Sequence, residues 1–235
     1  MNQHDHAGDG TTRTRRTSDR AADTRDALVA AALDVFGEIG FTDATISEIS
    51  RRAGRAHGSF YTYFDSKESI FREVIKRINR EESDRREAKA ERAPDDRAPT
   101  PEQRIARTND RFVETYRRHA RTLAAYEELA ARDDETRELR RATRLGYIER
   151  SVGSIERWQA DGTVDGSIDA EAVAHCLGSM VERVAHMRFV FGDGPDDERM
   201  MRAISDIWCA TLGLRADEGR TAALASAAER QGDQS

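Results

Sequence analysis

The residues between Arg55 and Lys67 have side-chain types that contact nucleic acids. Phe60 and Phe64, four residues apart, form one apolar face of a helix. The side chains left outside this face are small, hydroxylated, aromatic or cationic: Arg55, His57, Gly58, Ser59, Tyr61, Thr62, Tyr63 and Lys67. Such side chains suit a helix that lies against phosphates and base edges. The pattern therefore predicts a DNA-binding surface rather than a catalytic site.

A second short helix would precede this one and hold it in place. Thr45 can cap its start, and Glu48, three residues later, could complete a capping box. Its buried face would consist of apolar residues at helical spacing, Ile46, Ile49 and Ala53. Gly54 then supplies the tight turn, as glycine often does between the helices of a helix-turn-helix.

Two longer helices would flank this pair. The first is expected from Thr24 to Gly40, where Gly40 takes the position of a left-handed C-terminal cap. Its apolar stripe consists of Leu28, Ala32, Val35, Phe36 and Ile39. The other follows a cap at Asp65 or Ser66, and its inward residues are Ile70, Val74, Ile75 and Ile78. This fourth helix would connect the DNA-binding domain to the rest of the chain.

Positive charge is concentrated near the predicted surface, although the chain as a whole has a net charge of −6. The acidic residues between positions 51 and 80 are Asp65, Glu68 and Glu73. The basic ones are Arg51, Arg52, Arg55, Lys67, Arg72, Lys76, Arg77 and Arg80. The segment therefore has a net charge of +5 before His57 is counted. The placement of charge matters more for DNA binding than its sum over the chain.

The segment from about Thr24 to Arg80 resembles the DNA-binding domain of the TetR family of one-component repressors. The matching residues are Ala32, Phe36, Gly40, Phe41, Thr45, Ile49, Ala53, Gly54, Phe60, Tyr61, Tyr63, Phe64, Ser66, Lys67 and Glu68. The resemblance implies a homodimeric transcriptional regulator, most simply a repressor. It would bind a palindromic double-stranded DNA operator and release it when an unidentified small molecule occupies the second domain.

The resemblance also implies roles for single residues. Phosphate contacts are implied for Thr45, Tyr61, Tyr63 and Lys67. The first turn of the recognition helix, which usually meets bases and phosphates, holds His57, Gly58 and Ser59. Thr62 could contact a thymine methyl group or a phosphate. Thr45 can serve as helix cap and phosphate contact at once, and Gly58 either allows close approach of DNA or relieves packing.

The chain departs from the family pattern directly after the turn glycine. A small apolar residue and a Ser or Thr cap are usual there, and this chain has Arg55 and Ala56 instead. Ala56 cannot cap the recognition helix. Arg55 adds a cation that could reach a phosphate or a guanine edge. The departure leaves the fold unchanged but makes the operator sequence unpredictable from the family.

The remainder of the chain also reads as helical. Only four prolines occur and no strand alternation is present, so we expect an all-α fold. The charged stretch Glu81–Glu91 would extend the fourth helix as a solvated surface, before a break at 93–101. Five helices are then expected: one from Pro101 onward and the others at 121–131, 134–160, 170–191 and 196–213. Thr100 would cap the first of them, with Pro101 and Gln103 at its first and third helical positions.

These elements predict four segments. Residues 1–23 would be a disordered arm, 24–80 the helix-turn-helix DNA-binding domain, 81–214 a helical ligand-binding and dimerisation domain, and 215–235 a flexible tail. The arm contains Arg13, Arg15, Arg16 and Arg20. These arginines could enter the minor groove beside the operator, or the arm could be a solvated tail, because four aspartates offset their charge.

The family resemblance implies a ligand pocket walled by the first four helices of the second domain. Its candidate residues are Phe112, Tyr116, Tyr126, Tyr147, Trp158, Arg183 and His186. Each aromatic residue has an alternative interpretation as ordinary core. No metal or other cofactor is expected, because His175 and His186 lie three helical turns apart and cannot share an ion.

The last two helices carry the features of an interface between two copies of the chain. Their apolar stripes contain Val173, Leu177, Met180, Val184, Met187, Phe191, Met201, Ile204, Ile207 and Trp208. Small residues that would allow close approach are Ala174, Gly178, Ala185 and Ala203. The resemblance implies that this pair meets its symmetry mate as a four-helix bundle, and a two-fold dimer would require a palindromic operator.

Other functional classes find little support in the sequence. No Gly-x-Ser-x-Gly elbow, phosphate loop, His-Glu-x-x-His motif or metal-spaced cysteine pair occurs, so we do not expect an enzyme. A helical interaction protein that does not bind DNA is the other alternative, favoured only by the acidic pI of 5.6. Without a signal peptide or membrane segment, the protein is expected in the cytoplasm. Cys176 and Cys209 would be two buried thiols there, and the alternative is a redox-sensing disulfide, which nothing in the sequence selects.

Overall fold

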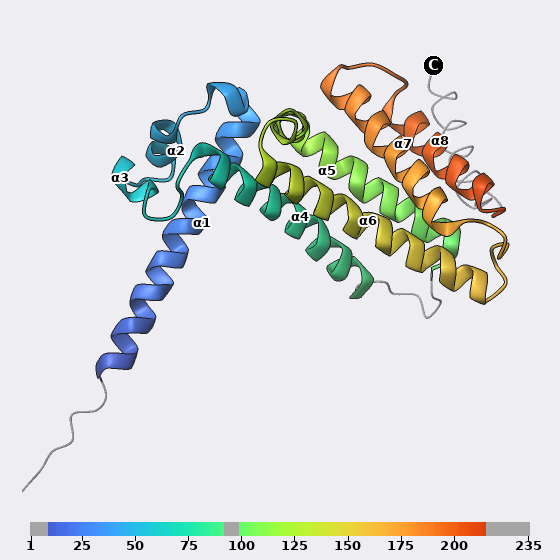
Figure 1. Cartoon of the computed structure of the whole chain (residues 1–235), viewed down its shortest axis with the longest axis horizontal. Helices are drawn as coiled ribbons and strands as arrows, with labels where there is room; N and C mark the ends of the chain where they lie inside the picture. Colours follow the sequence, from blue (N-terminus) through green and yellow to red (C-terminus); the bar gives the residue numbers. More distant parts are fainter. Residues whose placement is uncertain (1–8, 92–98, 215–235) are drawn as a thin grey trace, which may run out of the picture. The chain divides into compact units, whose positions relative to one another are not determined.

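The structure, a computed structural model, describes residues 9–91 and 99–214, and the side chains of residues 21–83 and 99–214. Eight helices lie in these ranges (Figure 1). They divide between two compact units, the first containing, of the described residues, 9–80 and 121–139, and the second 81–91, 99–120 and 140–214. Three helices, α4 (Lys67–Glu91), α5 (Pro101–Ala130) and α6 (Asp134–Ala160), contribute one end to each unit. Each unit is therefore assembled from segments that are distant in sequence.

The first unit is built on α1 (Asp9–Asp43), α2 (Ile46–Arg52), α3 (His57–Phe60) and the beginning of α4. Its core confirms the predicted inward residues of these helices, apart from Ile39, which is exposed in the last turn before Gly40. Phe36, Phe41 and Phe71 pack with ring centroids 4.8 to 5.6 Å apart. The C-terminal part of α5 completes the core with Tyr126 and Leu129. Residues 121–139 thus stabilise the helix-turn-helix unit, a role that the sequence did not predict.

The two ends of α1 differ from prediction. The helix begins at Asp9 rather than Thr24, so the arginine-rich part of the predicted arm is helical. No proline or glycine occurs between Gly10 and Gly37, and nothing in that stretch stops a helix. At the other end, Gly40 has the predicted positive φ (82°), but its ψ of 171° is extended rather than left-handed helical. Only glycine populates this region readily, so Gly40 turns the chain sharply toward α2.

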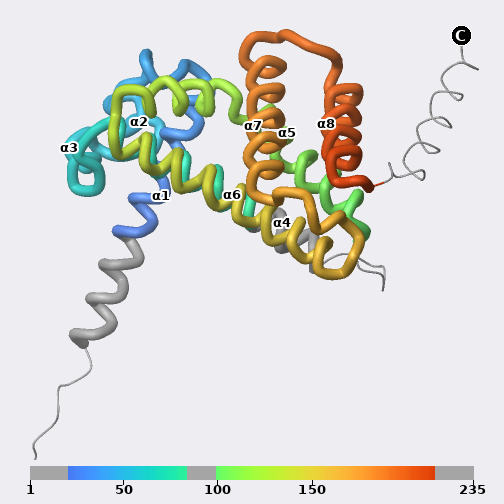
Figure 2. The backbone as a smooth tube through the Cα atoms, turned by 45° about the vertical axis from the view of Figure 1, so that its right-hand side comes forward, coloured from blue at the N-terminus to red at the C-terminus, as the bar shows by residue number. Residues whose placement is uncertain are grey.

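The second unit contains α7 (Ala170–Val190) and α8 (Asp197–Thr211), which lie side by side in Figures 1 and 2. Two aspartates cap these helices: Asp169 accepts a hydrogen bond from the Ala172 N–H at 3.0 Å, and Asp196 one from the Arg199 N–H at 2.9 Å. The core of the unit consists mainly of aliphatic residues from α5 to α8, including Ile105, Val113, Ile148, Ile155, Leu177, Val181, Met200 and Ile204.

The first two predicted helices after residue 100 form one helix in the structure. Thr100 and Gln103 cap its start reciprocally, each N–H donating to the other side chain at 3.3 Å. The expected division appears as a kink at His119 (φ −119°, ψ 22°) inside α5. The break predicted at 93–101 lies mostly outside the described residues. Of the two cysteines, Cys209 is buried as predicted, whereas Cys176 is exposed, and neither forms a disulfide bond.

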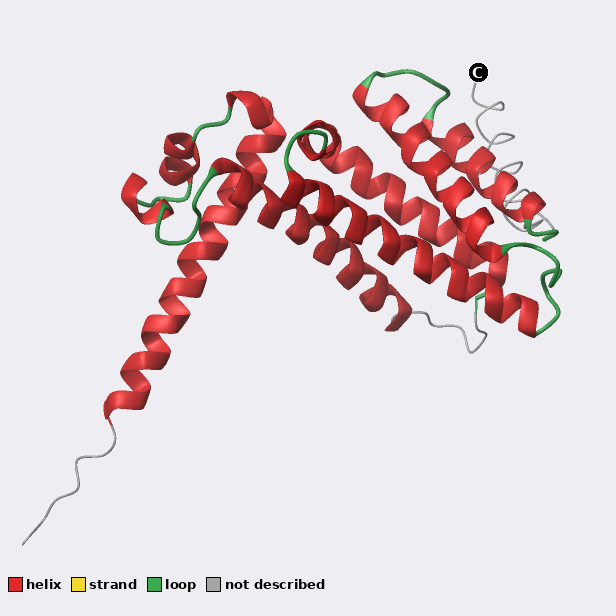
Figure 3. Cartoon of the chain, viewed as in Figure 1, coloured by secondary structure: helices red, strands yellow, loops and turns green. Residues whose placement is uncertain are grey.

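The all-α prediction is confirmed for the described ranges, in which Figure 3 shows helices and loops but no strand. One of the small residues expected to allow close approach is used inside the chain. A Cβ added at Gly178 of α7 would lie 3.3 Å from Ile148 Cδ1 of α6. Gly178 therefore permits tight packing between these two helices of one protomer.

Candidate functional site

Thr45 caps α2 as predicted, but the capping box is not completed. Its Oγ1 accepts a hydrogen bond from the Glu48 N–H at 3.2 Å. The Glu48 carboxylate instead accepts two hydrogen bonds from Arg51, at 2.9 and 2.7 Å, and a longer one from Arg52 at 3.5 Å. The bonds from Arg51 are the main reason that the pKa of Glu48 is lowered. A carboxylate gains more from guanidinium partners than from one backbone amide.

The turn and the recognition helix follow the sequence prediction in part. Gly54 has a φ of +64°, in the left-handed region that favours glycine. Ala56 stands at the N-cap of α3 and makes no side-chain hydrogen bond there. The helix itself is shorter than predicted: it ends at Phe60, and residues 61–63 form a turn. Phe60 and Phe64 are both buried in the core of the first unit.

Five of the predicted DNA contacts form one exposed surface, which we call the α3 face: Arg55, His57, Gly58, Tyr61 and Thr62. His57 Nδ1 lies 3.3 Å from the Ser47 hydroxyl, and its ring meets Tyr61 edge-on with centroids 5.6 Å apart. Tyr61 is 53% exposed. The buried phenylalanines hold α3 from below, so these polar side chains are presented to solvent.

Gly58 is not required by the protein's own structure. It lacks the positive φ of the turn glycines. A Cβ added at this position would meet no heavy atom within 4 Å. Glycine is an unfavourable residue in a helix, where it is less stabilising than alanine by about 1 kcal/mol. The open space above Gly58 is on the α3 face itself.

The other predicted DNA contacts lie in different surroundings. Ser59 is half-buried, and Tyr63 is half-buried against the core of the first unit. The Lys67 ammonium donates hydrogen bonds to the carbonyl oxygens of Phe41, Thr42 and Ala44 at 2.8, 3.2 and 3.0 Å. It also lies 4.5 Å from the centroid of the Phe41 ring. Because an ammonium has three donors, Lys67 is fully engaged in holding the end of α1 and the start of α2.

The positive charge counted along residues 51–80 is largely neutralised by acids from elsewhere. Arg52 pairs with Glu38 at 2.6 Å, and Arg51 with Glu48 at 2.7 Å. Arg72 pairs with Asp133, between α5 and α6, and with Glu135 of α6. Arg55, by contrast, forms no ion pair with any residue that the structure describes. The charge of the α3 face therefore comes from Arg55.

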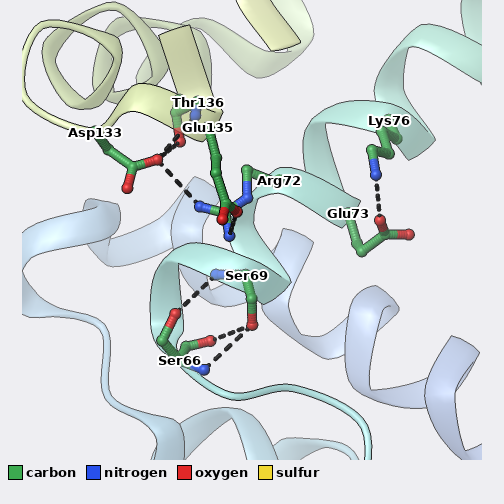
Figure 4. Close-up of polar contacts among 8 residues, drawn as sticks. All are labelled: Ser66, Ser69, Arg72, Glu73, Lys76, Asp133, Glu135 and Thr136. Atoms are coloured by element: carbon green, nitrogen blue, oxygen red, sulfur yellow. Dashed lines mark hydrogen bonds and ion pairs between the residues drawn. The ribbon is translucent and has the colours of Figure 1, made fainter. Parts of the chain in front are cut away.

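Arg72 joins α4 to the start of α6 inside the first unit (Figure 4). It donates to Asp133 Oδ2 at 3.0 Å and pairs with Glu135. The same Asp133 oxygen accepts from the Thr136 N–H at 2.8 Å and the Thr136 hydroxyl at 2.5 Å. These bonds, the Thr136 hydroxyl first, lower the pKa of Asp133. Figure 4 also shows Ser66 and Ser69, whose reciprocal side-chain to N–H bonds confirm Ser66 as the cap of α4.

Four of the seven ligand-site candidates meet in the second unit, and we call them the aromatic cluster: Phe112, Tyr116, Tyr147 and His186. The Tyr116 hydroxyl and His186 Nδ1 lie 2.9 Å apart, and both residues are buried. The Phe112 ring lies 6.0 Å from the rings of both Tyr116 and Tyr147. The cluster draws on α5, α6 and α7, as a site between helices would.

The remaining candidates lie elsewhere. Tyr126 follows the kink in α5 and belongs to the core of the first unit. Trp158 packs against the aliphatic core of the second unit, and Arg183 is exposed. For Tyr126 and Trp158, the alternative interpretation as core residues matches their position.

Sequence reasoning missed one member of this region. Glu82 of α4 was expected on a solvated surface, but it is buried, and its Oε2 accepts a hydrogen bond from the Tyr147 hydroxyl at 2.9 Å. The signal was present in the helical spacing, because Val74, Ile78 and Glu82 follow one another at intervals of four. The helical periodicity therefore places the charged residue Glu82 on the inward face of α4.

Comparison with known proteins agrees with this geometry. Residues 28–74 match the family model for bacterial regulatory proteins of the tetR family. Residues 105–212 match the model for the C-terminal domain of the transcriptional regulator EthR. The chain belongs to the TetR family of transcriptional regulators. TetR-family proteins are regulators that bind DNA through a helix-turn-helix, and the α3 face lies in the part that matches the tetR model.

Individual TetR-family proteins match this chain at higher identity over short stretches than over most of its length. The chain is 46% identical over 56 residues to the regulator YdgC of Bacillus subtilis, and 43% over 63 residues to the repressor BepR of Brucella suis. These matches cover 24% and 27% of this chain, and 29% and 30% of the two relatives. The regulator EthR of Mycobacterium tuberculosis is 24% identical over 204 residues, which cover 85% of this chain and 92% of EthR.

Solved structures share the fold at low sequence identity. A TetR-family regulator from Rhodococcus sp. has a TM-score of 0.67 at 15% identity, over 81% of this chain and 99% of that one. A regulator from Saccharomonospora viridis in complex with choline has a TM-score of 0.64 at 18% identity, over 79% and 95%. FadR of Bacillus subtilis in complex with stearoyl-CoA also has a TM-score of 0.64 at 18% identity, over 77% and 96%. Among the described residues, no helix combines the length and hydrophobicity needed to cross a membrane.

Proposed function

We propose that this TetR-family regulator is a cytoplasmic repressor that binds a palindromic operator as a homodimer and releases it when a small molecule binds the second unit. The observation that supports DNA binding most strongly is the α3 face. It presents aromatic, hydroxylated and cationic groups to solvent on a helix that is fixed from below by Phe60 and Phe64. A recognition helix needs this combination of a rigid base and an exposed polar surface.

Within the α3 face, each residue has a proposed task. Arg55 would bind a phosphate or a guanine edge, since it is the cation of the α3 face and forms no ion pair with a described residue. Tyr61 would bind a phosphate, and His57 and Thr62 would meet base edges or phosphates. Gly58 would let the DNA approach the helix closely, because the space above it is empty in the protein.

The other predicted contacts take supporting roles in this proposal. Thr45 caps α2 and remains placed for a phosphate. Ser59 and Tyr63 lie at the edge of the α3 face, half-buried. Lys67 would act indirectly, because its three hydrogen bonds to carbonyl oxygens set the position of α2 relative to α1.

Homodimerisation is proposed through α7 and α8. Phe191, directly after α7, is 64% exposed, and Ile207 of α8 is 44% exposed. Large apolar side chains in solvent on two neighbouring helices favour burial against another protein surface. A second copy of the chain is the partner that would give a two-fold dimer and a palindromic operator.

Ligand response is proposed for the aromatic cluster. Two solved relatives of the same fold hold small molecules, choline in one and stearoyl-CoA in the other. Ligand binding in the second unit would be transmitted along α4, α5 and α6, which contribute to both units. The coupling would be reciprocal, so that bound operator weakens ligand binding by the factor by which ligand weakens operator binding.

Footprinting of the DNA upstream of the protein's own gene, at two salt concentrations, tests this proposal. We expect a protected palindrome that is lost at high salt, because phosphate contacts make affinity fall steeply with salt. Binding that ignores both sequence and salt would favour the alternative of an interaction protein without an operator. Light scattering on the same sample checks the dimer, and a monomeric mass at micromolar concentration would contradict it.

A further inference from the structure

The buried acid Glu82 has no compensating positive charge among the residues whose side chains the structure describes. Glu82 is 7% exposed, and within the described part of the chain its carboxylate accepts one hydrogen bond, from the Tyr147 hydroxyl. No described lysine, arginine or histidine lies within ion-pair distance of its carboxylate. Removing a carboxylate from water without a counter-charge is strongly unfavourable. Glu82 is therefore a buried acid to which a single described group, the Tyr147 hydroxyl, donates a hydrogen bond.

The side chains beside Glu82 are those that bind cations through aromatic rings. The hydroxyl that donates to Glu82 belongs to Tyr147, whose ring stands perpendicular to Phe112 at a centroid distance of 6.0 Å. Phe112 in turn lies 6.0 Å from Tyr116. Ring faces attract ammonium groups, most strongly where water is excluded. The Glu82 carboxylate and the neighbouring rings of Tyr147 and Phe112 could therefore offer a negative charge and π-faces to one ligand.

One ring of the cluster already has a cation beside it. The guanidinium carbon of Arg150 lies 4.6 Å from the centroid of the Tyr147 ring. Arg150 is exposed and forms no ion pair with Glu82. The Tyr147 ring thus accommodates a positive charge, while the carboxylate at its hydroxyl end does not receive one.

Polar groups for the rest of a ligand are also buried nearby on α5. Asn109 lies one helical turn before Phe112 and two before Tyr116, on the same side of the helix. It is 6% exposed, and its Nδ2 has no hydrogen-bond partner in the described structure. Buried amides are normally hydrogen-bonded, so this donor is available for a ligand oxygen.

We propose that Glu82 and the aromatic cluster bind an organic cation, a quaternary ammonium or a protonated amine. The positive centre lies beside the Glu82 carboxylate, and its carbon substituents contact the rings of Phe112 and Tyr147. The Asn109 amide donates to an oxygen of the ligand. This inference names the effector class of the proposed function and rests on it.

Direct binding to the full chain without DNA tests the site. The probe pair is choline and 3,3-dimethylbutan-1-ol, which have the same shape and differ in charge. Calorimetric titration at constant ionic strength, to about 10 mM of each, should show saturable choline binding at least about tenfold tighter than that of the alcohol. Equal affinities, or no saturable choline binding, would overturn the proposal.

Substitutions assign the charge preference to one residue. Glu82→Gln should abolish the preference for choline over the alcohol, because glutamine accepts the Tyr147 hydrogen bond without a charge. Glu149→Gln removes the same charge from an exposed position two residues after Tyr147 and should leave the preference unchanged. Loss of preference in both variants would mean a general charge effect and would contradict a specific site.

Thermal unfolding without ligand separates a binding role from a structural one. Because Glu82→Gln removes an uncompensated buried charge and keeps the acceptor, its melting temperature should equal or exceed that of the wild type. A lower melting temperature together with intact choline preference would show that Glu82 only stabilises the fold.

Repeating the footprint with choline separates the site from the proposed regulator. Choline binding through Glu82 without any change in operator protection would leave the cation site standing and refute its role as effector site. Operator protection without choline binding would refute the cation site and leave the repressor standing.

Discussion

The α3 face and the aromatic cluster are built in opposite ways. The α3 face comes from residues 55–62, a single short stretch, and its polar groups are exposed. The aromatic cluster and Glu82 come from four helices, α4 to α7, and their polar groups are buried or, for Tyr147, half-buried, and form hydrogen bonds in pairs. A surface that meets DNA needs only local structure on a rigid base. A site that encloses a ligand needs distant segments to be brought together.

This difference extends to how charge is treated. Near the α3 face, arginines pair with acids such as Glu38 and Glu48, whereas Arg55 is exposed and pairs with no acid that the structure describes. In the second unit the acid Glu82 is buried with a neutral partner. An exposed charge without a partner has a small energetic effect, whereas a buried one has a large effect on both stability and binding.

The largest effect on stability is expected from removing the buried ring beneath the α3 face. Phe60→Ala removes a fully buried ring and should lower the free energy of unfolding by about 3 to 5 kcal/mol. Tyr61→Ala, at the neighbouring exposed position, should change it by less than about 0.5 kcal/mol but weaken operator binding. Urea denaturation of both variants measures the contrast. Similar losses of stability would mean that α3 has no separate inner and outer sides.

The next effect concerns the hydrogen bond inside the cluster. Tyr147→Phe leaves Glu82 buried without its donor and should lower the free energy of unfolding by about 1 to 3 kcal/mol. Tyr61→Phe deletes the same hydroxyl from the exposed α3 face and should be within about 0.5 kcal/mol of the wild type. Thermal and urea unfolding provide the comparison. A neutral Tyr147→Phe would show that the Glu82 carboxylate reaches solvent.

A smaller effect is expected at Gly58, where one substitution should change operator affinity without lowering the free energy of unfolding. Gly58→Ala should leave stability unchanged or raise it by up to about 1 kcal/mol, because the new Cβ meets no protein atom. Operator affinity should nevertheless fall about tenfold if DNA occupies that space. Gly166→Ala is the matched control, since its Cβ also meets nothing, but it lies away from the α3 face. An unchanged operator affinity in Gly58→Ala would remove Gly58 from the interface.

The smallest effect is a pH dependence of the link between α4 and α6. The pKa of Asp133 is lowered by the Thr136 hydroxyl and by Arg72, so its contribution to stability is present above its ordinary pKa of about 3.9. It is lost as pH falls through the lowered value. Asp133→Asn should therefore reduce the acid-induced loss of stability below about pH 4 by up to about 1 kcal/mol.

Asp43→Asn is the control for this experiment, because Asp43 is an exposed carboxylate of the same unit. Urea unfolding at several pH values between about 2 and 6 measures both variants. If the two curves lose stability in parallel with the wild type, Asp133 does not link the helices through its charge.

Sequence reasoning was most successful where structure is local. The starts of α6, α7 and α8 were predicted to within one residue of Asp134, Ala170 and Asp197, because polar residues mark them. The inward faces of α2, α3 and α4 followed from apolar periodicity. Thr45, Gly54 and Ala56 behave as their residue types dictate.

Features that depend on distant pairs were not predictable. The partners Arg72 and Asp133 are 61 residues apart, and Tyr147 and Glu82 are 65 apart. Periodicity places each residue on a helix face but does not name the helix that it meets. Lys67 was assigned to phosphate for the same reason, because the three carbonyl oxygens that it binds lie at and directly after the end of α1, 23 to 26 residues earlier.

The salt dependence of operator affinity tests the role of the α3 face most directly. Fluorescence anisotropy with the footprinted operator would be measured over a range of salt for the wild type, Arg55→Ala and Arg107→Ala, an exposed control arginine of α5. We predict that Arg55→Ala lowers the slope of log affinity against log salt by about 1 per protomer and that Arg107→Ala leaves it unchanged. Identical slopes for all three proteins would contradict the account, because the unpaired charge of the α3 face would then not contact DNA.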